Sequence, residues 1–579
     1  ASTARTPEEF GAVGDGLAND TVPVQAAFTA AGDGGRVRLD GLYLITAAIT
    51  HSGAIEVEGV GTIIVGADVA GAALDIDVPT LATLTVTAID NAETTVFSGD
   101  QLTDTDCARI TVSAANASLV AGAICKIVST DQLTGVETGK NRGEFVWIGG
   151  TEASGTEALT SARLTDTYST TPELVILDTS KKVHIQGIKF RTSSFAGATA
   201  GSWAFAFLRI VGAVAPFVES VTFTEGTDIA CQFQGCIGQR TQGLTVRRML
   251  NRIDTFSAGY GIQDGGCSYG QHSGGYFEDC RHGYTTVAHT ASTSPKVSWG
   301  RNRGTVVASC IAFACSAGAF DTHSDADGVV FLGCQADAGY QGRTSSYSGY
   351  QFRGQRVRGV GCQARGHKFG FVFFKQESGE ATEHELVGCG YDGGGTPFRQ
   401  FSNNGAITGR LTDFSYRSTG VAGIRLQGVM RVQGGHFDYI GTDNAGHVFE
   451  LDDDADAVTL VAENFLARFA DATGNNCRLA SFQGDGIHTV RLKGEVQVGS
   501  NTWQGVISTS SPAKAIDVEF MVDADAAPTN PLGHFNLTGG TIAGTLTIDR
   551  ARTSTSARIQ RNSLSANHAL DIENQMAAI

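Results

Sequence analysis

The sequence is poor in methionine, proline and charged residues, with 4 Met, 10 Pro and a charged fraction of 17% in 579 residues. Glycine is abundant instead, at 74 residues, about 13% against a usual ~7%. This composition favours many tight turns over long helices. Because 41% of the residues are hydrophobic, the chain can bury a substantial core, and we expect it to be folded for most of its length.

Basic residues, long apolar runs and targeting signals are also scarce. The formal net charge of −17 disfavours a nucleic-acid or anionic-membrane partner. The longest apolar stretch, residues 204–218, is interrupted by Arg209 and is too short to span a bilayer. The opening ASTARTPEEF has no basic-then-apolar signal segment. We therefore expect a soluble chain with no nucleic-acid partner and no membrane insertion.

The twelve cysteines contain no CxxC pair and no Cys/His cluster with zinc spacing, which argues against a metal–thiolate site. Five of them sit instead beside short strand-like runs at intervals of 24 to 30 residues, and several follow a glycine; they are Cys280, Cys310, Cys334, Cys362 and Cys389. A period in the twenties, with one strand-like run per repeat and no amphipathic helix between repeats, is typical of a β-solenoid.

In a solenoid each repeat forms one coil, and equivalent residues of successive coils stack about 4.8 Å apart. A row of small apolar side chains then becomes a continuous buried ladder, for which free cysteine is well suited. The alternative is an antiparallel β-sandwich with coincidentally spaced cysteines. The recurring Gly-Cys pair argues against the sandwich.

Residues 10–45 predict a cap at the start of the winding. A short helix is expected to begin at Asn19, Asp20 or Thr21, which are all good N-cap candidates, to carry Pro23 in its first turn and to end near Gly32. Its apolar face would consist of Val24, Ala27 and Phe28. Such a helix plugs the solenoid, because the first coil otherwise exposes an apolar cross-section and unpaired strand edges.

The stretch FGAVGDGLANDTVPVQAAF, followed by GGRVRLDGLYLI, resembles the opening motif of the pectate-lyase-like, or polygalacturonase-like, β-helix superfamily. The resemblance implies an all-β fold, a right-handed parallel β-helix with a short N-terminal capping helix. That superfamily includes polygalacturonase-type glycosidases and phage tailspike depolymerases. It holds both hydrolases and lyases, so the motif does not choose the reaction.

The absent signal segment and the C-terminal sequence favour the tailspike branch. After residue 524 a proline-containing link leads to short alternating strands that carry little core of their own. Tailspikes typically end in a region that packs three chains, so the resemblance implies a homotrimer. A monomeric C-terminal cap is the alternative. The branch also implies a location in the virion tail, outside the host cell, and a removed N-terminal particle-binding segment is a further expectation.

We expect four regions along the chain. Residues 1–50 would hold the cap and first strand, and residues 51–180 the early coils with a β-rich insertion at about 80–175. Residues 181–523 would form the central parallel β-helix, and residues 524–579 a small C-terminal β-rich trimerisation region.

The segment FDTHSDADG is the most unusual polar stretch. In a regular strand, alternation would place Asp321, His323, Asp325 and Asp327 on one face. The functional interpretation is a catalytic carboxylate with a histidine that orients it or handles a proton. Two alternatives remain: a structural calcium ion held by Asp325 and Asp327, although the full ligand pattern is absent, and a solvated turn. No other cofactor is expected.

The cysteine spacing suggests a partner for Asp321. Asp321 lies 13 positions before Cys334, and Glu377 lies 12 before Cys389, with one coil between them. Two coils would place the backbones of Asp321 and Glu377 roughly 10 Å apart. If the two side chains lean towards each other, their carboxyl groups could reach the ~6.5–9.5 Å separation found in inverting glycosidases. We predict Asp321 and Glu377 as the acid/base pair, with His323 assisting.

Nearby aromatic, cationic and acidic side chains are predicted to bind the glycan, by stacking on sugar faces or by holding its polar groups. They are Asp264, Glu278, Arg281, His282, Tyr347, Tyr350, Arg353 and Lys375. Arg281 and His282 would also suit a lyase, in which a cation neutralises a uronate and a base removes the neighbouring proton. His282 has a structural alternative as a satisfied residue beside a turn.

Together these patterns predict a phage tailspike-type depolymerase, an endo-glycosidase that hydrolyses a capsular, exo- or O-antigen polysaccharide on a bacterial surface. A polysaccharide lyase acting by β-elimination on a uronate-containing glycan is the first alternative. A non-catalytic glycan-binding receptor protein is the second.

Overall fold

The computed structural model describes residues 3–67, 69–93, 107–193, 205–250, 259–290, 295–339, 348–420, 422–441, 446–451, 458–469, 478–482, 488–498, 505–509, 514–524, 535–537, 546–549, 559–561 and 572–573. The chain divides into two compact units. The first unit comprises Ala1–Ser316 and Asp321–Val329, and the second comprises Ala317–Phe320 and Val330–Ile579. No helix in the described part is long and apolar enough to cross a membrane.

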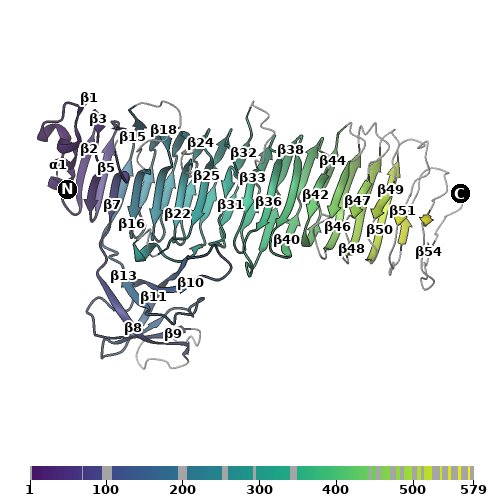
Figure 1. Cartoon of the computed structure of the whole chain (residues 1–579), viewed down its shortest axis with the longest axis horizontal. Helices are drawn as coiled ribbons and strands as arrows, with labels where there is room; N and C mark the ends of the chain where they lie inside the picture. The colour runs from purple at the N-terminus through teal and green to yellow at the C-terminus, as the bar shows by residue number, and fades with distance from the viewer. Residues whose placement is uncertain are drawn as a thin grey trace. The chain divides into compact units, whose positions relative to one another are not determined.

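The predicted capping helix is confirmed as α1, Thr21–Ala31, which Figure 1 shows at the N-terminal end of the strands. Its apolar face is fully buried through Val24, Ala27 and Phe28. Asp20 stands at the N-cap position, but its carboxylate does not cap the helix. It accepts hydrogen bonds from the backbone of Val13 and Gly14 and so ties down the preceding loop.

The coils of the first unit place their strands in three parallel rows, one strand of each coil in each row (Figure 1). The first row contains β2 (Gly35–Leu39), β5 (Ile55–Gly59), β14 (Val183–Gln186), β17 (Phe217–Glu219), β20 (Arg240–Gln242), β23 (Gln271–Ser273) and β27 (Val306–Ala308). The second row contains β1 (Asp15–Asn19), β3 (Leu42–Ile45), β6 (Thr62–Val65), β15 (Lys189–Thr192), β18 (Thr222–Thr227), β21 (Thr245–Leu250), β24 (Tyr276–Glu278) and β28 (Ile311–Phe313). The third row contains β4 (Ile49–Ser52), β7 (Ala72–Asp77), β16 (Ala206–Val211), β19 (Ile229–Gln234), β22 (Tyr260–Gly265) and β25 (His282–Val287).

The second unit repeats this pattern. Its first row contains β31 (Val330–Leu332), β34 (Arg358–Val360), β37 (Glu383–Val387), β40 (Ile407–Thr412) and β43 (Gly428–Gln433). Its second row contains β32 (Gln335–Asp337), β35 (Gln363–Arg365), β38 (Gly390–Gly393), β41 (Ser415–Ser418) and β44 (His436–Tyr439). Its third row contains β33 (Ser348–Phe352), β36 (Phe369–Lys375), β39 (Thr396–Ser402), β42 (Ala422–Leu426), β45 (His447–Leu451), β47 (Arg478–Phe482) and β49 (Gly505–Thr509). These rows confirm the predicted all-β, right-handed parallel β-helix.

Towards the C-terminus the first two rows merge into long strands. β46 (Thr459–Phe469) pairs with both β43 and β44 and is followed by β48 (His488–Val498) and β50 (Lys514–Ala524). The described strands after residue 524 extend the same parallel pairings: β51 (Phe535–Leu537), β52 (Leu546–Asp549), β53 (Ile559–Arg561) and β54 (Ile572–Glu573). The trimerisation role of this region stays a prediction.

The five cysteines of the predicted ladder are all buried, but one of them stands in a different row. Cys362 and Cys389 directly precede β35 and β38, which pair in register, and the backbone N–H of Cys362 lies 3.4 Å from the Cys389 sulfur. In the first unit Tyr276 pairs with Ile311, so Gly275 is the residue opposite Cys310. Cys280 was therefore wrongly aligned, because it follows the second-row strand β24, whereas the other four cysteines follow first-row strands.

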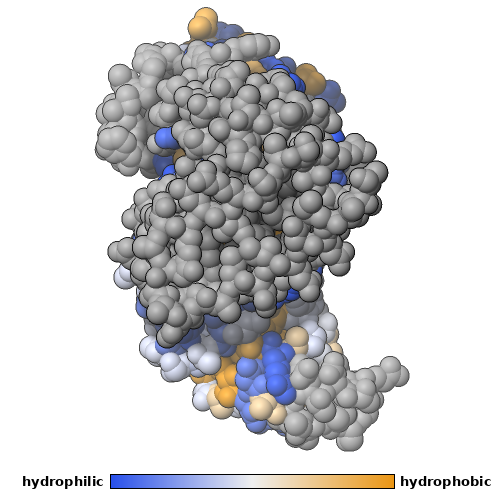
Figure 2. All heavy atoms as spheres, turned by 90° about the vertical axis from the view of Figure 1, so that its right-hand side faces the viewer, coloured by the Kyte–Doolittle hydropathy of each residue, from blue (hydrophilic) through white to orange (hydrophobic). Residues whose placement is uncertain are grey.

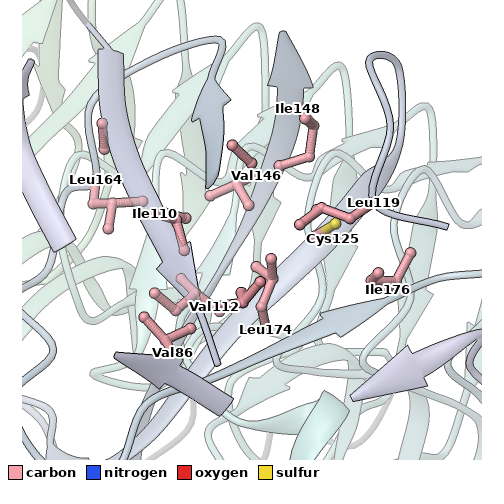
Figure 3. Packing of buried hydrophobic residues seen from close by; sticks show 13 residues of the cluster. Val86, Ile110, Val112, Leu119, Cys125, Val146, Ile148, Leu164, Leu174 and Ile176 are labelled. Carbon is pink, nitrogen blue, oxygen red and sulfur yellow. The ribbon is translucent and has the colours of Figure 1, made fainter. Parts of the chain in front are cut away.

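Between β7 and β14 the chain forms a closed antiparallel barrel of β8 (Ala82–Glu93), β9 (Cys107–Val112), β10 (Ile124–Gln132), β11 (Asn141–Thr151), β12 (Glu157–Thr160) and β13 (Glu173–Ile176). This barrel occupies the stretch in which a β-rich insertion was expected. Its own core gathers residues such as Val86, Ile110, Val146 and Leu174 (Figure 3). Figure 1 shows β10 and β13 on the side towards the coils, and Figure 2 shows hydrophilic and hydrophobic residues side by side on the lower coloured surface, where the barrel lies.

The barrel is fixed to the coils of the first unit by a mixed interface. Phe145 and Val175 of the barrel share an apolar cluster with Val211 and Trp299 of the coils. The Arg303 guanidinium lies 3.0 Å from the Glu144 carboxylate and 3.2 Å from that of Asp166. These contacts hold the barrel against the coils of the first unit.

Candidate functional site

The candidate site lies in the first unit, where three segments meet. β25 contributes His282, Thr285 and Thr286, and the segment after β29 (Phe320–Asp321) contributes His323. The third segment is the barrel loop 133–140 between β10 and β11, which carries Glu137.

Asp321 is the buried centre of the site, with a side chain that has no solvent exposure. Its Oδ2 accepts a 3.1 Å hydrogen bond from the Thr285 hydroxyl. The same oxygen lies 3.7 Å from Nε2 of His282 and 3.5 Å from Nε2 of His323. A buried carboxylate needs such partners, because an isolated charge in the interior is costly.

His323 connects this buried carboxylate to a second one nearer the surface. Its Nδ1 lies 3.6 Å from Oε1 of Glu137, and its backbone N–H donates to the Thr286 hydroxyl at 2.9 Å. Side-chain exposure rises from 0% at Asp321 to 21% at His323 and 33% at Glu137. The three side chains thus form a carboxylate–imidazole–carboxylate series that runs from the interior to solvent.

His282, predicted to bind substrate, belongs to this cluster. Its side chain is 6% exposed, and its ring stacks on Tyr260 with 5.1 Å between the centroids. The structure therefore supports a role beside Asp321 more than direct contact with a large ligand.

The expectation that residues 321, 323, 325 and 327 share one strand face is wrong. The backbone N–H of Ala326 donates to the carbonyl of His323, so a turn separates β29 from β30 (Ala326–Asp327). Asp325 turns away and accepts a hydrogen bond from the Asn302 amide, and burial raises the pKa of its carboxyl. Asp327 lies 3.7 Å from Arg303, at the barrel interface.

The two carboxylates proposed for calcium therefore have different partners, an amide for Asp325 and a guanidinium for Asp327. Among the described residues no three His, Cys, Asp or Glu side chains are grouped as metal ligands.

Asp264 does not line the site, which corrects its prediction as a substrate-binding residue. It is fully buried and accepts hydrogen bonds from His272 and from the Tyr284 hydroxyl, both at 3.1 Å. It pairs in register with Phe233 and Thr286, whose side chains are buried as well. Burial raises the pKa of Tyr284 well above its usual value, with the Asp264 charge as the second cause.

Glu278 and Arg281 flank the coil corner outside this cluster. Glu278 belongs to the second row of strands and forms a 3.1 Å ion pair with Arg247. Arg281 is half-buried, and its backbone N–H donates to the Gly259 carbonyl at 2.7 Å. Glu278 therefore lies in a different row from the third-row strand that carries His282 and Thr285.

Tyr350, predicted to stack on a sugar, is a core residue of the second unit. It has no solvent exposure, and its ring stacks between Phe320 and Phe371 at centroid distances of 5.2 and 4.7 Å. Its hydroxyl donates to the Gln363 carbonyl at 3.3 Å. The prediction was wrong because Tyr350 occupies an inward position of β33. Tyr347 lies outside the described residues.

Arg353, Lys375 and Glu377 lie together in the second unit. Arg353 donates to the Gln376 side chain at 3.0 Å, and Lys375 donates to the Ala406 carbonyl at 3.3 Å. Glu377 is half-buried in the turn after β36, and its backbone N–H donates to Glu380. Asp321 and Glu377 belong to different units, so their pairing stays a prediction.

No known family profile matches the sequence. Among solved structures, the chain is similar to the tailspike protein gp49 of Pseudomonas phage LKA1, with 16% identity, a TM-score of 0.56, and coverage of 93% of this chain and 83% of that one. It is also similar to the tailspike gp61 of Pseudomonas phage phi297, with 14% identity, a TM-score of 0.53, and coverage of 94% and 81%. In fold, the chain is a right-handed parallel β-helix of the kind found in phage tailspikes.

Proposed function

We propose that this chain is a phage tailspike-type depolymerase that binds a bacterial surface polysaccharide and cleaves it internally. The observation that carries the proposal is the buried Asp321 carboxylate in contact with the imidazoles of both His282 and His323. The shared fold with tailspikes supports the class of protein, and the cluster supports proton-transfer chemistry.

For hydrolysis, one group protonates the leaving glycosidic oxygen while another removes a proton from water. The water oxygen bonds to the anomeric carbon as the carbon–oxygen bond to the leaving sugar breaks. Asp321 holds His323 in place, and the half-buried His323 ring is the more exposed member of this pair. The 3.5 Å separation of this pair is longer than a hydrogen bond, as is common before a substrate binds. Glu377 remains the proposed second carboxylate.

Positive side chains near the candidate residues would suit an acidic glycan. Arg353 and Lys375 of the second unit, and Arg281 of the first, are the proposed contacts. We also propose a homotrimer located in the virion tail, for which the molar mass in solution is the direct test.

Two imidazoles on one carboxylate also favour the lyase alternative. In β-elimination a base removes the proton beside a uronate carboxylate, and the leaving oxygen departs as a carbon–carbon double bond forms. His323 is the half-buried base of this pair, and His282 supports the same Asp321 carboxylate from the buried side at 3.7 Å.

The test is incubation with purified surface polysaccharides from candidate hosts, following chain length, reducing ends and ultraviolet absorbance together. Shortening with new reducing ends and no gain in absorbance supports the hydrolase. Shortening with a gain in absorbance reassigns the protein to the lyases. Binding without shortening overturns the catalytic proposal in favour of a glycan-binding receptor.

A further inference from the structure

We propose that Glu137, carried by the inserted barrel, is a positioning residue for His323, so that the barrel is part of the catalytic centre. This inference rests on the proposed function and deepens it. It assigns a role to a side chain that belongs to none of the coils and that the sequence pattern did not single out.

The geometry places one carboxylate at each nitrogen of the ring. Nε2 of His323 lies 3.5 Å from Asp321, and Nδ1 lies 3.6 Å from Glu137. A doubly protonated imidazole has a donor on both nitrogens, so one carboxylate at each nitrogen can fix the orientation of the ring. Asp321 acts from the buried side and Glu137 from the solvent side.

The barrel loop is held against the histidine by several contacts, so Glu137 is not a freely moving surface residue. Its backbone N–H donates to the Ser324 hydroxyl at 3.2 Å. Arg301 joins the two segments, because its guanidinium donates to the carbonyls of Ser324 and Thr134 at 3.4 and 2.5 Å. On the apolar side of the loop, Leu133 and Val136 pack against Ala288 of the coils.

Further charged groups surround the ring. Lys140 lies 3.5 Å from Glu137 and partly offsets its charge. His282 shares the Asp321 oxygen with His323, and Asp325 interacts electrostatically with His323. The buried Arg301 adds a positive charge beside the turn. Of these groups only Glu137 and Asp321 are paired with the nitrogens of His323, so removal of either should change the orientation of the ring.

The test compares Glu137→Gln with the matched control Glu173→Gln. Glu173 is also a barrel carboxylate that pairs with the coils, at 2.6 Å from Lys296, but it lies outside the site. For Glu137→Gln we expect kcat on the cleaved glycan to fall about tenfold or more with KM nearly unchanged. Glu137→Asp, which keeps the carboxylate on a shorter side chain, should recover part of the lost kcat. Glu173→Gln should behave as the wild type.

A second measurement does not depend on cleavage. The ring signals of His323 can be followed in NMR spectra of histidine-labelled protein at one fixed pH, with assignment from the His323→Asn spectrum. In Glu137→Gln the His323 ring signals should shift, because the ring loses one of its two carboxylate partners, and in Glu173→Gln they should not. If Glu137→Gln misfolds, Glu137→Asp keeps the charge on a shorter side chain and should give a smaller shift of the same signals.

The two proposals fail in distinguishable ways. If the wild type cleaves no glycan while Glu137→Gln moves the His323 ring signals, the proposed function fails and the pairing stands. If the His323 ring signals of Glu137→Gln match those of the wild type, the role of Glu137 is overturned whether or not glycan is cleaved.

Discussion

Nε2 of His323 lies 3.5 Å from Oδ2 of Asp321, although only one residue separates them in the chain. This approach depends on the turn that begins at His323 and on the Thr286 hydroxyl, which accepts the His323 backbone N–H. In a regular strand the side chains of residues 321 and 323 would also point to the same face. The strand would not, however, fold the His323 ring back onto the Asp321 carboxylate. The interruption of the strand therefore brings His323 and Asp321 together.

Asp321→Asn should lower kcat on the cleaved polysaccharide by a factor of at least ~10². The amide keeps the shape of the side chain but removes the charge that orients His323. Glycan binding should persist, because Asp321 has no solvent exposure. Asp392→Asn on β38, an exposed carboxylate in the second unit, serves as the control and should retain full activity. Full activity of Asp321→Asn would contradict its assignment.

Glu377→Gln tests the pairing predicted from the cysteine spacing. If Glu377 is the second carboxylate, kcat should fall by a factor of ~10² or more with little change in thermal stability. Its neighbour Glu380 provides a contrast: it is buried, accepts the backbone N–H groups of Gln376 and Glu377, and burial raises the pKa of its carboxyl. Glu380→Gln should lower the melting temperature instead. Cleavage by Glu377→Gln within twofold of the wild type would remove Glu377 from the mechanism.

The fold could be predicted because its helix and its coils are each marked by a local sequence pattern. The capping helix could be predicted from Gly32 at its C-terminal end and from its apolar face, and the coil repeat from the Gly-Cys pairs. Register is harder to predict, since coils differ in loop length. Cys280 kept the spacing of the ladder yet stands in another row, with Gly275 opposite Cys310.

The site was only partly predictable for related reasons. Asp321, His323 and His282 were found because polar residues are unusual beside buried strands. Asp264 and Tyr350 were misassigned because the sequence does not say which phase of an alternating strand faces the core. Glu137 was missed because it comes from an inserted barrel far earlier in the chain, and no periodic pattern aligns it with His323.

Tyr350→Phe should leave glycan affinity unchanged, because the ring lies inside the second unit between Phe320 and Phe371. Loss of the hydroxyl's bond to the Gln363 carbonyl should cost about 0.5–1.5 kcal/mol of unfolding free energy. Calorimetric titration with the glycan and urea unfolding measure the two effects. Arg353→Gln, at a predicted contact, should weaken binding of an acidic glycan. A tenfold loss of glycan affinity in Tyr350→Phe would mean that Tyr350 contacts the glycan after all.

Lys126 should make the stability of the first unit depend on pH. This barrel lysine is buried, donates to the Gly266 carbonyl and lies 4.4 Å above the Phe145 ring. Burial lowers its pKa to about 7, whereas in the unfolded chain it is about 10.4. Between these values the unfolded state binds more protons, so unfolding free energy should rise with pH, by at most about 1.4 kcal/mol per pH unit.

Lys126→Met keeps an apolar stem of similar length and removes the titrating group. We expect the slope of unfolding free energy against pH to be smaller in this variant than in the wild type between about pH 7 and pH 10. Urea unfolding at several pH values, followed by the fluorescence of Trp299 at the same interface, measures the difference. Lys296→Met removes a solvent-exposed lysine that also joins barrel and coils and should keep the wild-type slope. Equal slopes in Lys126→Met and the wild type would mean that Lys126 remains charged in the folded protein. The Gly266 carbonyl and the Phe145 ring would then stabilise the buried ammonium group.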